Sequence, residues 1–253
     1  MAPALTRRAL PLLGPLLLLA LWQLAISAQW VKAVLLPPPA DTLAHLVGVF
    51  ANGAILADLW ATVYRTLASF GIAVVIGVPL GVVLGASQGA YRSVEFVIDF
   101  FRSTPSSALI PLFMLIFGIT DINKIAIASF GAMLIVLFNS AYGVMNAKKT
   151  RVMAAQIMGV SRWHVFKDVL LMESLAQTFV GLRSAVSMAL VIVIVAEMFI
   201  GSDTGLGHRI IDSQQVLNVK SMYASILAAG ALGYVLNILA LVVERRIVHW
   251  SGR

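Results

Sequence analysis

The sequence predicts an all-α, polytopic membrane protein, a helical bundle of about six transmembrane helices. The chain has 253 residues, of which 60% are hydrophobic and only 11% charged, whereas soluble domains average about 25% charged residues. Apolar runs near 20 residues long recur along it, which is the length that crosses a bilayer as a helix. These runs lack the alternation of barrel strands. No repeat or linker divides the chain, so residues 1–253 are predicted to form a single transmembrane domain.

The first span is predicted within residues 1–28, with its apolar run over 10–28. Arg7 and Arg8 precede this run, so a secretory signal cleaved near Ala28 is the alternative. The run is nearer a full span than a signal, which favours a retained helix. Residues 29–66 follow as an outer segment, in which Pro37, Pro38 and Pro39 predict a stiff turn before short helices at 42–50 and 56–64.

The other spans are predicted in two groups. Residues 67–145 hold spans two to four, and residues 179–253 hold spans five and six. The five apolar cores lie at 67–86, 96–118, 125–145, 179–201 and 222–243. Residues 146–178 form a basic loop between the groups, and 202–221 form an outer segment with a short helix near 210–217.

The basic residues predict the orientation. Twelve of the eighteen Lys and Arg residues fall in the segments on the same side as both termini, and four fall on the other side. Arg65 and Arg102 lie at span ends. Because positive charge collects in cytoplasmic loops, both termini are predicted to be cytoplasmic.

The basic loop carries its own helix pattern. Thr150 can cap a helix over 151–158, which Gly159 can end in a left-handed conformation. Ser161 can cap a second helix that places Trp163 and Phe166 on one face. This segment is either a helix pair lying on lipid headgroups or a docking surface for a cytoplasmic partner.

A stripe of small residues occupies one face of span two: Ala73, Gly77, Gly81 and Gly85. Small residues at this spacing allow two helix backbones to approach closely. The stripe predicts either tight packing within one subunit or an interface that moves around a pathway.

Several polar groups lie within or beside the predicted spans. Asp99 and Arg102 share a helix face. They form either an ion pair at the headgroup boundary or part of a translocation path. Pro105 follows, and neighbouring hydroxyls, Ser106 among them, can satisfy the carbonyl that proline frees. Glu197 lies in span five, where it either bonds a neighbouring helix near the outer surface or relays protons.

Other chemistries are excluded by composition or spacing. The four histidines are scattered and predict no metal cluster, and no catalytic triad is visible. No P-loop occurs, so the chain cannot hold ATP in that manner. The net charge is +7. The basic residues cluster beside the predicted spans rather than in one patch, which argues against nucleic-acid binding. Cysteine is absent.

Several of these motifs together resemble one family. Ala154 and Ala155, then Gly159, then the run from Ser161 to Leu171 are similar to the coupling loop of ABC-importer permeases. Met153 and Met172 depart from it, since the family has Glu and Pro there. The resemblance extends from about Trp22 to the C-terminus and is closest to the nitrate/sulfonate/taurine branch. It rests further on these residues: Leu36 to Pro39, Phe101 to Pro105, Pro111 to Phe113, Phe117 to Ile119, Ala196, Glu197, and Thr204 to Gly207.

The resemblance implies a prokaryotic inner-membrane permease subunit that moves a small, anionic solute such as nitrate, bicarbonate, a sulfonate or an aromatic carboxylate. Its implied partners are a second copy, two cytoplasmic ATPases that carry ATP and Mg²⁺, and an external solute-binding protein. The chain itself would bind no cofactor and catalyse no reaction. An ion-coupled secondary transporter and an integral-membrane enzyme are the alternatives.

The resemblance also assigns roles to residues of the motifs. Arg102 and Pro105 would lie beside the translocation path, to which Ser106 and Glu197 are added as polar residues of the spans. Thr204, Gly205, Leu206 and Gly207 would contact the binding protein or gate the outer mouth. The residues that couple to the ATPase would be Met153, Ala154, Ala155, Gly159, Ser161, Arg162, Trp163 and Phe166.

Overall fold

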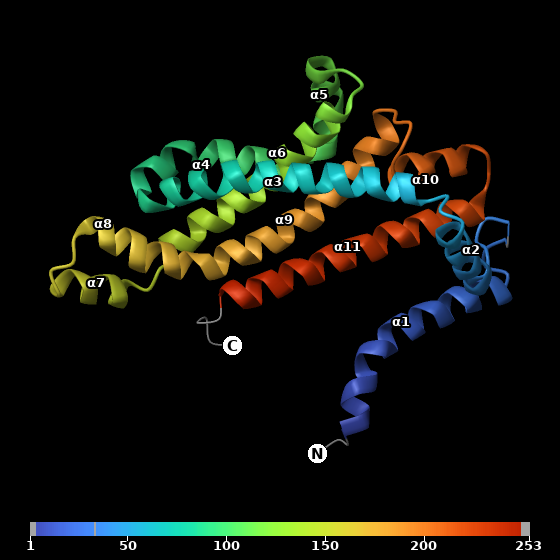
Figure 1. The fold of residues 1–253 in the computed structure, drawn as a ribbon, viewed down its shortest axis with the longest axis horizontal. Helices are drawn as coiled ribbons and strands as arrows, with labels where there is room; N and C mark the ends of the chain where they lie inside the picture. Colours follow the sequence, from blue (N-terminus) through green and yellow to red (C-terminus); the bar gives the residue numbers. More distant parts are fainter. Residues whose placement is uncertain (1–3, 33, 249–253) are drawn as a thin grey trace.

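The computed structural model describes residues 4–32 and 34–248, and every regular element among them is a helix (Figure 1). The all-α class predicted from the sequence is confirmed. Four long helices form the bundle: α3 (Leu56–Ala86), α6 (Asp121–Met145), α9 (Leu171–Phe199) and α11 (Val219–Ile247).

These four helices run along the long axis of the molecule (Figure 1). α6 packs against both α3 and α9, and α11 packs against α9. The short helices α2 (Pro39–Ala51) and α10 (Leu206–Gln215) lie at one end, and α7 (Lys149–Ile157) lies at the other. We call these ends the α10 end and the α7 end. The predicted orientation makes the α7 end cytoplasmic.

The third predicted span is broken rather than continuous. It consists of α4 (Gln88–Ser103), the 3₁₀ turn η1 (Ser106–Leu109) and α5 (Ile110–Phe117), with a bend of 90°. Proline disfavours a helical residue before it and donates no N–H, so the helix ends before Pro105. The carbonyl left without a helical N–H by Pro105 is that of Phe101, four residues earlier. The Ser103 and Thr104 hydroxyls instead donate to the Phe100 carbonyl, both at 2.9 Å, which also accepts the Thr104 backbone N–H, so these two hydroxyls do not satisfy the freed group as expected.

The described residues include four helices long and apolar enough to cross a membrane, or five if the bent pair counts as one span. The first predicted span corresponds to α1 (Ala4–Ser27), a helix of 24 residues. α1 leads away from the bundle below α11 (Figure 1).

The predicted outer helices are present with different limits. The one expected at 42–50 is α2, whereas the one expected at 56–64 is the first two turns of α3. No Gly or Pro interrupts residues 56–70, so the helix continues into the span. α10 begins four residues before its predicted start, because Gly205 (φ +132°) ends the preceding turn.

The basic loop forms a helical hairpin, which we call the elbow (residues 149–170). It consists of α7, a turn at Gly159, α8 (Arg162–His164) and a π-helical turn, η2 (Val165–Leu170). The predicted cap at Thr150 is wrong, since α7 already begins at Lys149 and its N-cap is Lys148. Ser161 is the N-cap of α8, but its hydroxyl lies 2.7 Å from Nδ1 of His164 instead of bonding a backbone N–H.

The elbow is not separated from span five. Residues Arg162–Phe199 form one continuous helical stretch of 38 residues. Met172 stands where the resembled family has proline, and methionine keeps the backbone N–H that a helix interior needs. The loop predicted at 146–178 therefore ends as an elbow fused to α9.

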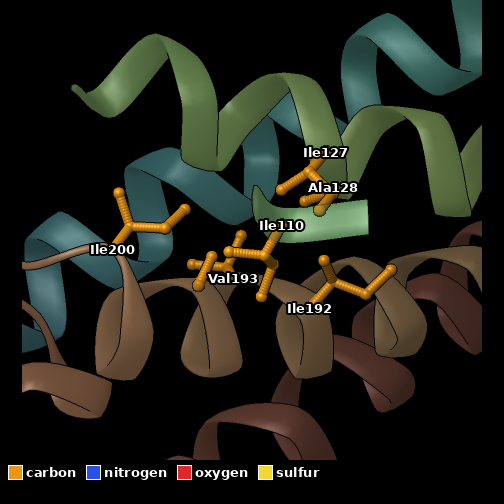
Figure 2. Packing of buried hydrophobic residues seen from close by; sticks show 7 residues of the cluster. Ile110, Ile127, Ala128, Ile192, Val193 and Ile200 are labelled. Carbon is orange, nitrogen blue, oxygen red and sulfur yellow. The ribbon is translucent and has the colours of Figure 1, made fainter. Parts of the chain in front are cut away.

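The apolar core lies where the broken span meets the bundle. Figure 2 shows Ile110, at the start of α5, between Ile127 and Ala128 of α6 and Val193 of α9. Ile127, Ala128 and Val193 have no exposed surface. Because lipid is as apolar as these side chains, close packing and dispersion hold this contact rather than escape from water.

Candidate functional site

The small-residue stripe lies between α3 and α6 of the same chain. Ala73, Gly77, Gly81 and Gly85 are all buried. A Cβ on Gly77 would lie 3.0 Å from the Met133 carbonyl oxygen, and one on Gly81 would lie 2.7 Å from Cβ of Ser140. The two backbones therefore approach at a distance that only glycine allows, which makes α3 and α6 one packed unit.

The elbow presents apolar side chains to solvent at the α7 end. Met153 is 58% exposed, Met158 80% and Trp163 66%. Ala154, Ser161 and Arg162 are also exposed, while Ala155 and Phe166 are half-buried. Gly159 has φ +74°, the left-handed conformation that its position predicted. Trp163 stacks on Phe166 at 5.9 Å between ring centroids.

The charges of the elbow are partly satisfied within the chain. Arg151 of α7 forms an ion pair with Glu173 of α9. This pair ties the first arm of the elbow to the helix that continues from its second arm. The arms are therefore held together by charge as well as by the turn at Gly159.

The broken span borders a small cavity of about 210 Å³ that includes Arg102, Pro105, Ser106, Gly131 and Met188 in its lining. Arg102 pairs with Asp99 at 3.5 Å, and its Cζ lies 4.1 Å from the centroid of the Phe138 ring. The side chains of Arg102 and Asp99 remain 43% and 58% exposed. The guanidinium therefore keeps donors available for an anion.

Glu197 lies apart from this cavity, at the α10 end. Its carboxylate has no exposed surface and accepts hydrogen bonds from Thr62 (2.9 Å), Nη1 of Arg65 (2.7 Å) and the backbone N–H of Gly207 (2.9 Å). The predicted bond from Glu197 to a neighbouring helix is present. The structure does not bring Glu197 together with Arg102, Pro105 and Ser106.

Arg65 connects four parts of the fold. Besides Glu197 of α9, it donates to Asp121 of α6 at 3.0 Å and to the Thr204 carbonyl at 2.8 Å. Lys124, which is 3% exposed, bonds the same Asp121 carboxylate and the hydroxyl of Ser202. A buried arginine is expensive unless its donors are satisfied, and here carboxylates and a carbonyl satisfy it.

The same group of residues holds the start of α10. The backbone N–H of Gly205 donates to Asp58, that of Leu206 donates to Thr62, and that of Gly207 donates to Glu197. The first N–H groups of a helix lack partners within the helix, so α3 and α9 together cap α10. We call this set the outer clasp: Asp58, Thr62, Arg65, Asp121, Lys124, Glu197, and residues 202–207.

Sequence reasoning found two parts of the outer clasp separately and missed its centre. Glu197 and the run from Thr204 to Gly207 were singled out, but Arg65 was treated only as a charge at a span end. The available signal was an arginine with Thr62 one turn before it and Ser69 one turn after it, all on one face of an apolar helix. Asp121 gave no signal in the sequence, since its pairing depends on how α6 packs.

Comparison with known proteins places the chain in a family. The model of the "Binding-protein-dependent transport system inner membrane component" family matches residues 77–249. The chain therefore belongs to this family, and it is an inner-membrane permease subunit of an ABC importer for small solutes. The resemblance stated from the coupling-loop motif is confirmed.

Two similar permeases come from Escherichia coli strain K12. The putative aliphatic sulfonates transport permease protein SsuC is 30% identical over 244 residues, covering 96% of this chain and 92% of its own. The taurine transport system permease protein TauC is 27% identical over 240 residues, covering 93% and 87%.

A solved structure shares the fold. An inward-facing form of the MetNI methionine ABC transporter contains a chain that is similar with a TM-score of 0.66 and 21% sequence identity. The match covers 76% of this chain and 95% of that one.

Proposed function

We propose that the chain moves a small anion of the sulfonate type through the inner membrane, driven by ATP that two separate cytoplasmic ATPase subunits hydrolyse. A second copy of the chain completes the pathway, and an external solute-binding protein delivers the anion. ATP and Mg²⁺ belong to the ATPases, since this chain has no P-loop.

The observation that carries this proposal is the continuous helix from the elbow to the outer clasp. The stretch Arg162–Phe199 begins in the exposed apolar elbow and contains Glu197 near its other end. At 1.5 Å per residue it is roughly 55 Å long. A displacement of the elbow by a docked ATPase is thereby transmitted to the start of α10, because a packed helix moves as a rigid body.

The role of the elbow as a docking surface follows from its exposed side chains. Ile157 and Met158 are 87% and 80% exposed at the end of α7. Flexible, polarisable methionine side chains fit an apolar groove on a partner. The alternative is that the elbow lies on lipid headgroups.

The outer clasp is the counterpart at the other end. Thr204, Gly205, Leu206 and Gly207 connect α9 to α10, and their backbone is fixed by the clasp rather than by packing alone. We assign α10 to contact with the solute-binding protein or to the outer gate. Movement of α9 then repositions α10 because Glu197 bonds its first turn.

The anionic solute is inferred from Arg102. Its guanidinium lies beside the broken span, between Asp99 and the Phe138 ring, at a cavity lined by α6 and α9 residues. Arginine presents several donors in a fork that matches an oxyanion such as a sulfonate. The names of SsuC and TauC, which refer to sulfonates and taurine, agree with this choice.

Reconstitution tests the proposal. The permease is purified in mild detergent with the ATPase encoded beside it and placed in proteoliposomes with its binding protein and radiolabelled taurine. We expect ATP-dependent uptake that Arg102→Gln lowers and Arg102→Lys partly keeps. Uptake driven by a proton or sodium gradient without ATP would instead support a secondary transporter.

A further inference from the structure

An apolar groove separate from the elbow, the Arg102 cavity and the outer clasp lies between three helices. It has a volume of about 380 Å³ and is lined by one face each of α3, α9 and α11: Leu67, Phe70, Val74, Phe179, Leu182, Arg183, Val186, Leu236, Leu239, Ala240 and Val243. We call it the three-helix groove. Ten of its eleven lining residues are apolar, which suits a hydrocarbon chain rather than a polar solute.

Arg183 is the exception in this lining. Its side chain is half-buried, and within the described part of the chain its guanidinium has no ion pair and no hydrogen bond. A charged side chain in a span normally pairs or extends to the interface. Among the described residues Arg183 has no counter-charge, which leaves its guanidinium available to an anionic group at the interface.

The depth of Arg183 identifies the leaflet. It lies sixteen residues before Phe199 on α9, which is about 24 Å from the α10 end of that helix. The hydrocarbon core of a bilayer is about 30 Å thick. Arg183 therefore lies just inside the interface at the α7 end, within reach of a lipid phosphate of that leaflet.

A second basic group lies at the same end. Arg246 follows Val243 by three residues on α11 and is exposed, so it continues the face that lines the groove. Glu244 also lies in this turn, but it is buried. Basic pockets between transmembrane helices on the cytoplasmic side are suited to anionic headgroups.

We propose that the three-helix groove binds an anionic phospholipid, with its phosphate at Arg183 and Arg246 and one acyl chain along α3, α9 and α11. The competing occupant is α1, which is apolar and splays from the bundle. Its sequence, ALTRRALPLLGPLLLLALWQLAIS, contains no acidic residue. α1 could fill the apolar part of the groove but would leave Arg183 without a counter-charge.

The test compares variants of the full chain in nanodiscs of phosphatidylglycerol and phosphatidylcholine. Native mass spectrometry then counts the phosphatidylglycerol retained after transfer to mild detergent. We expect Arg183→Gln to lower retention about fivefold, and Arg183→Lys to keep most of it. The matched control is Arg92→Gln, which removes an exposed charge on α4, away from the groove. Equal retention in Arg183→Gln and Arg92→Gln overturns the proposal.

Two further variants separate the groove from simple surface charge. Ala240→Phe fills the groove while Arg183 stays, so it should also lose phosphatidylglycerol; undiminished retention would show that the groove is not the site. The chain has no cysteine, so Leu17→Cys with Ala240→Cys reports whether α1 occupies the groove. Complete cross-linking of that pair in phosphatidylglycerol-rich membranes would assign the groove to α1 and overturn the lipid proposal.

Discussion

Gly159 shows how one residue sets the shape of the elbow. Its φ of +74° is a conformation that a β-branched residue adopts only under strain, and a Cβ there would meet no neighbouring atom within 4 Å. Gly159→Val should therefore act through the backbone alone, at a cost of about 1–2 kcal/mol. We expect normal membrane levels but reduced co-purification of the ATPase.

The control for this prediction is Gly89→Val. Gly89 lies in the first turn of α4 and has no positive φ, and a Cβ there would meet only the Ser87 hydroxyl oxygen, at 4.0 Å. ATPase association should be unchanged in that variant. If Gly159→Val binds and stimulates the ATPase as well as wild type, the tight turn is not needed for docking.

Met153 is one of the apolar side chains on the proposed docking surface. It is 58% exposed, and nearby Arg151 is already paired with Glu173, so we expect the ATPase to dock chiefly through apolar contact. Apolar burial is not screened by salt as exposed ion pairs are. ATPase activity of the reconstituted wild-type complex should change little between low and high ionic strength, while Met153→Glu should be weaker at both. A steep loss of wild-type coupling with salt would show that Arg162 or Lys167 docks the ATPase instead.

Glu197 is the buried acid on which the outer clasp depends. Glu197→Gln would leave Arg65 with a weaker partner and loosen the capped start of α10. Removing one member of a buried ion pair costs about 3–5 kcal/mol, and the remaining bond from Arg65 to Asp121 places the expected loss at the lower end. Thermal unfolding in detergent and proteolysis of the α10 region would both report it. Asp203→Asn removes an exposed charge from the same loop and should leave both measurements unchanged.

At the scale of residues, the sequence predicted groups whose signal is local. Gly159 was predictable because a helix pattern stops there, and Glu197 because a lone acid in an apolar run needs a partner. Arg65, Asp121 and Lys124 were not assigned, since their roles arise from contacts across 56 to 132 positions. Such contacts are set by helix packing, which a single sequence does not reveal.

At the scale of elements, the contact between α3 and α6 offers an internally controlled test. Gly81→Leu would push the α6 backbone away, because Ser140 already lies 2.7 Å from the position of a Cβ. Overpacking of this kind costs about 1–3 kcal/mol, so we expect a lower melting temperature in detergent. Gly71→Leu changes the same helix where nothing lies within 4 Å, and it should be neutral. Equal melting temperatures for the two variants would contradict the packing role of the stripe.

The elements themselves were largely predictable, but two junctions were not. The long helices were predictable from the length of the apolar runs, because a helix needs about 20 apolar residues to cross a bilayer. The 90° bend after Ser103 exceeded the expected kink, since η1 and α5 pack against α6 and the core shown in Figure 2 fixes their direction. The fusion of the elbow to α9 was missed because helical periodicity around residue 170 does not distinguish two abutting helices from one.

At the scale of the whole molecule, the continuity of Arg162–Phe199 predicts that transmission can be lost without loss of docking. Val169→Gly with Leu170→Gly places two residues of poor helix propensity, each costing about 1 kcal/mol relative to alanine, at the end of the elbow where it joins α9. We expect ATPase binding and hydrolysis to persist while taurine uptake in proteoliposomes falls.

The matched control is Val169→Ala with Leu170→Ala, which removes the same side chains but keeps the helix. Its uptake should stay well above that of the glycine pair. If the two pairs transport equally, the side chains of this turn matter and helix continuity does not.

The outer clasp also constrains how the protein is made. Arg65 is synthesised 56 residues before Asp121 and 132 residues before Glu197. At translation rates of about 5–20 residues per second, the interval between the synthesis of Arg65 and that of Glu197 is roughly 7 to 26 seconds. Asp121 is the first acid of the clasp to follow Arg65 in the chain, and its half-exposed side chain can accept the guanidinium before α9 exists. Glu197 is made only with the fifth predicted span, and Thr204 follows it, so a nascent chain that stops short of α9 holds this arginine with Asp121 alone among its two acids.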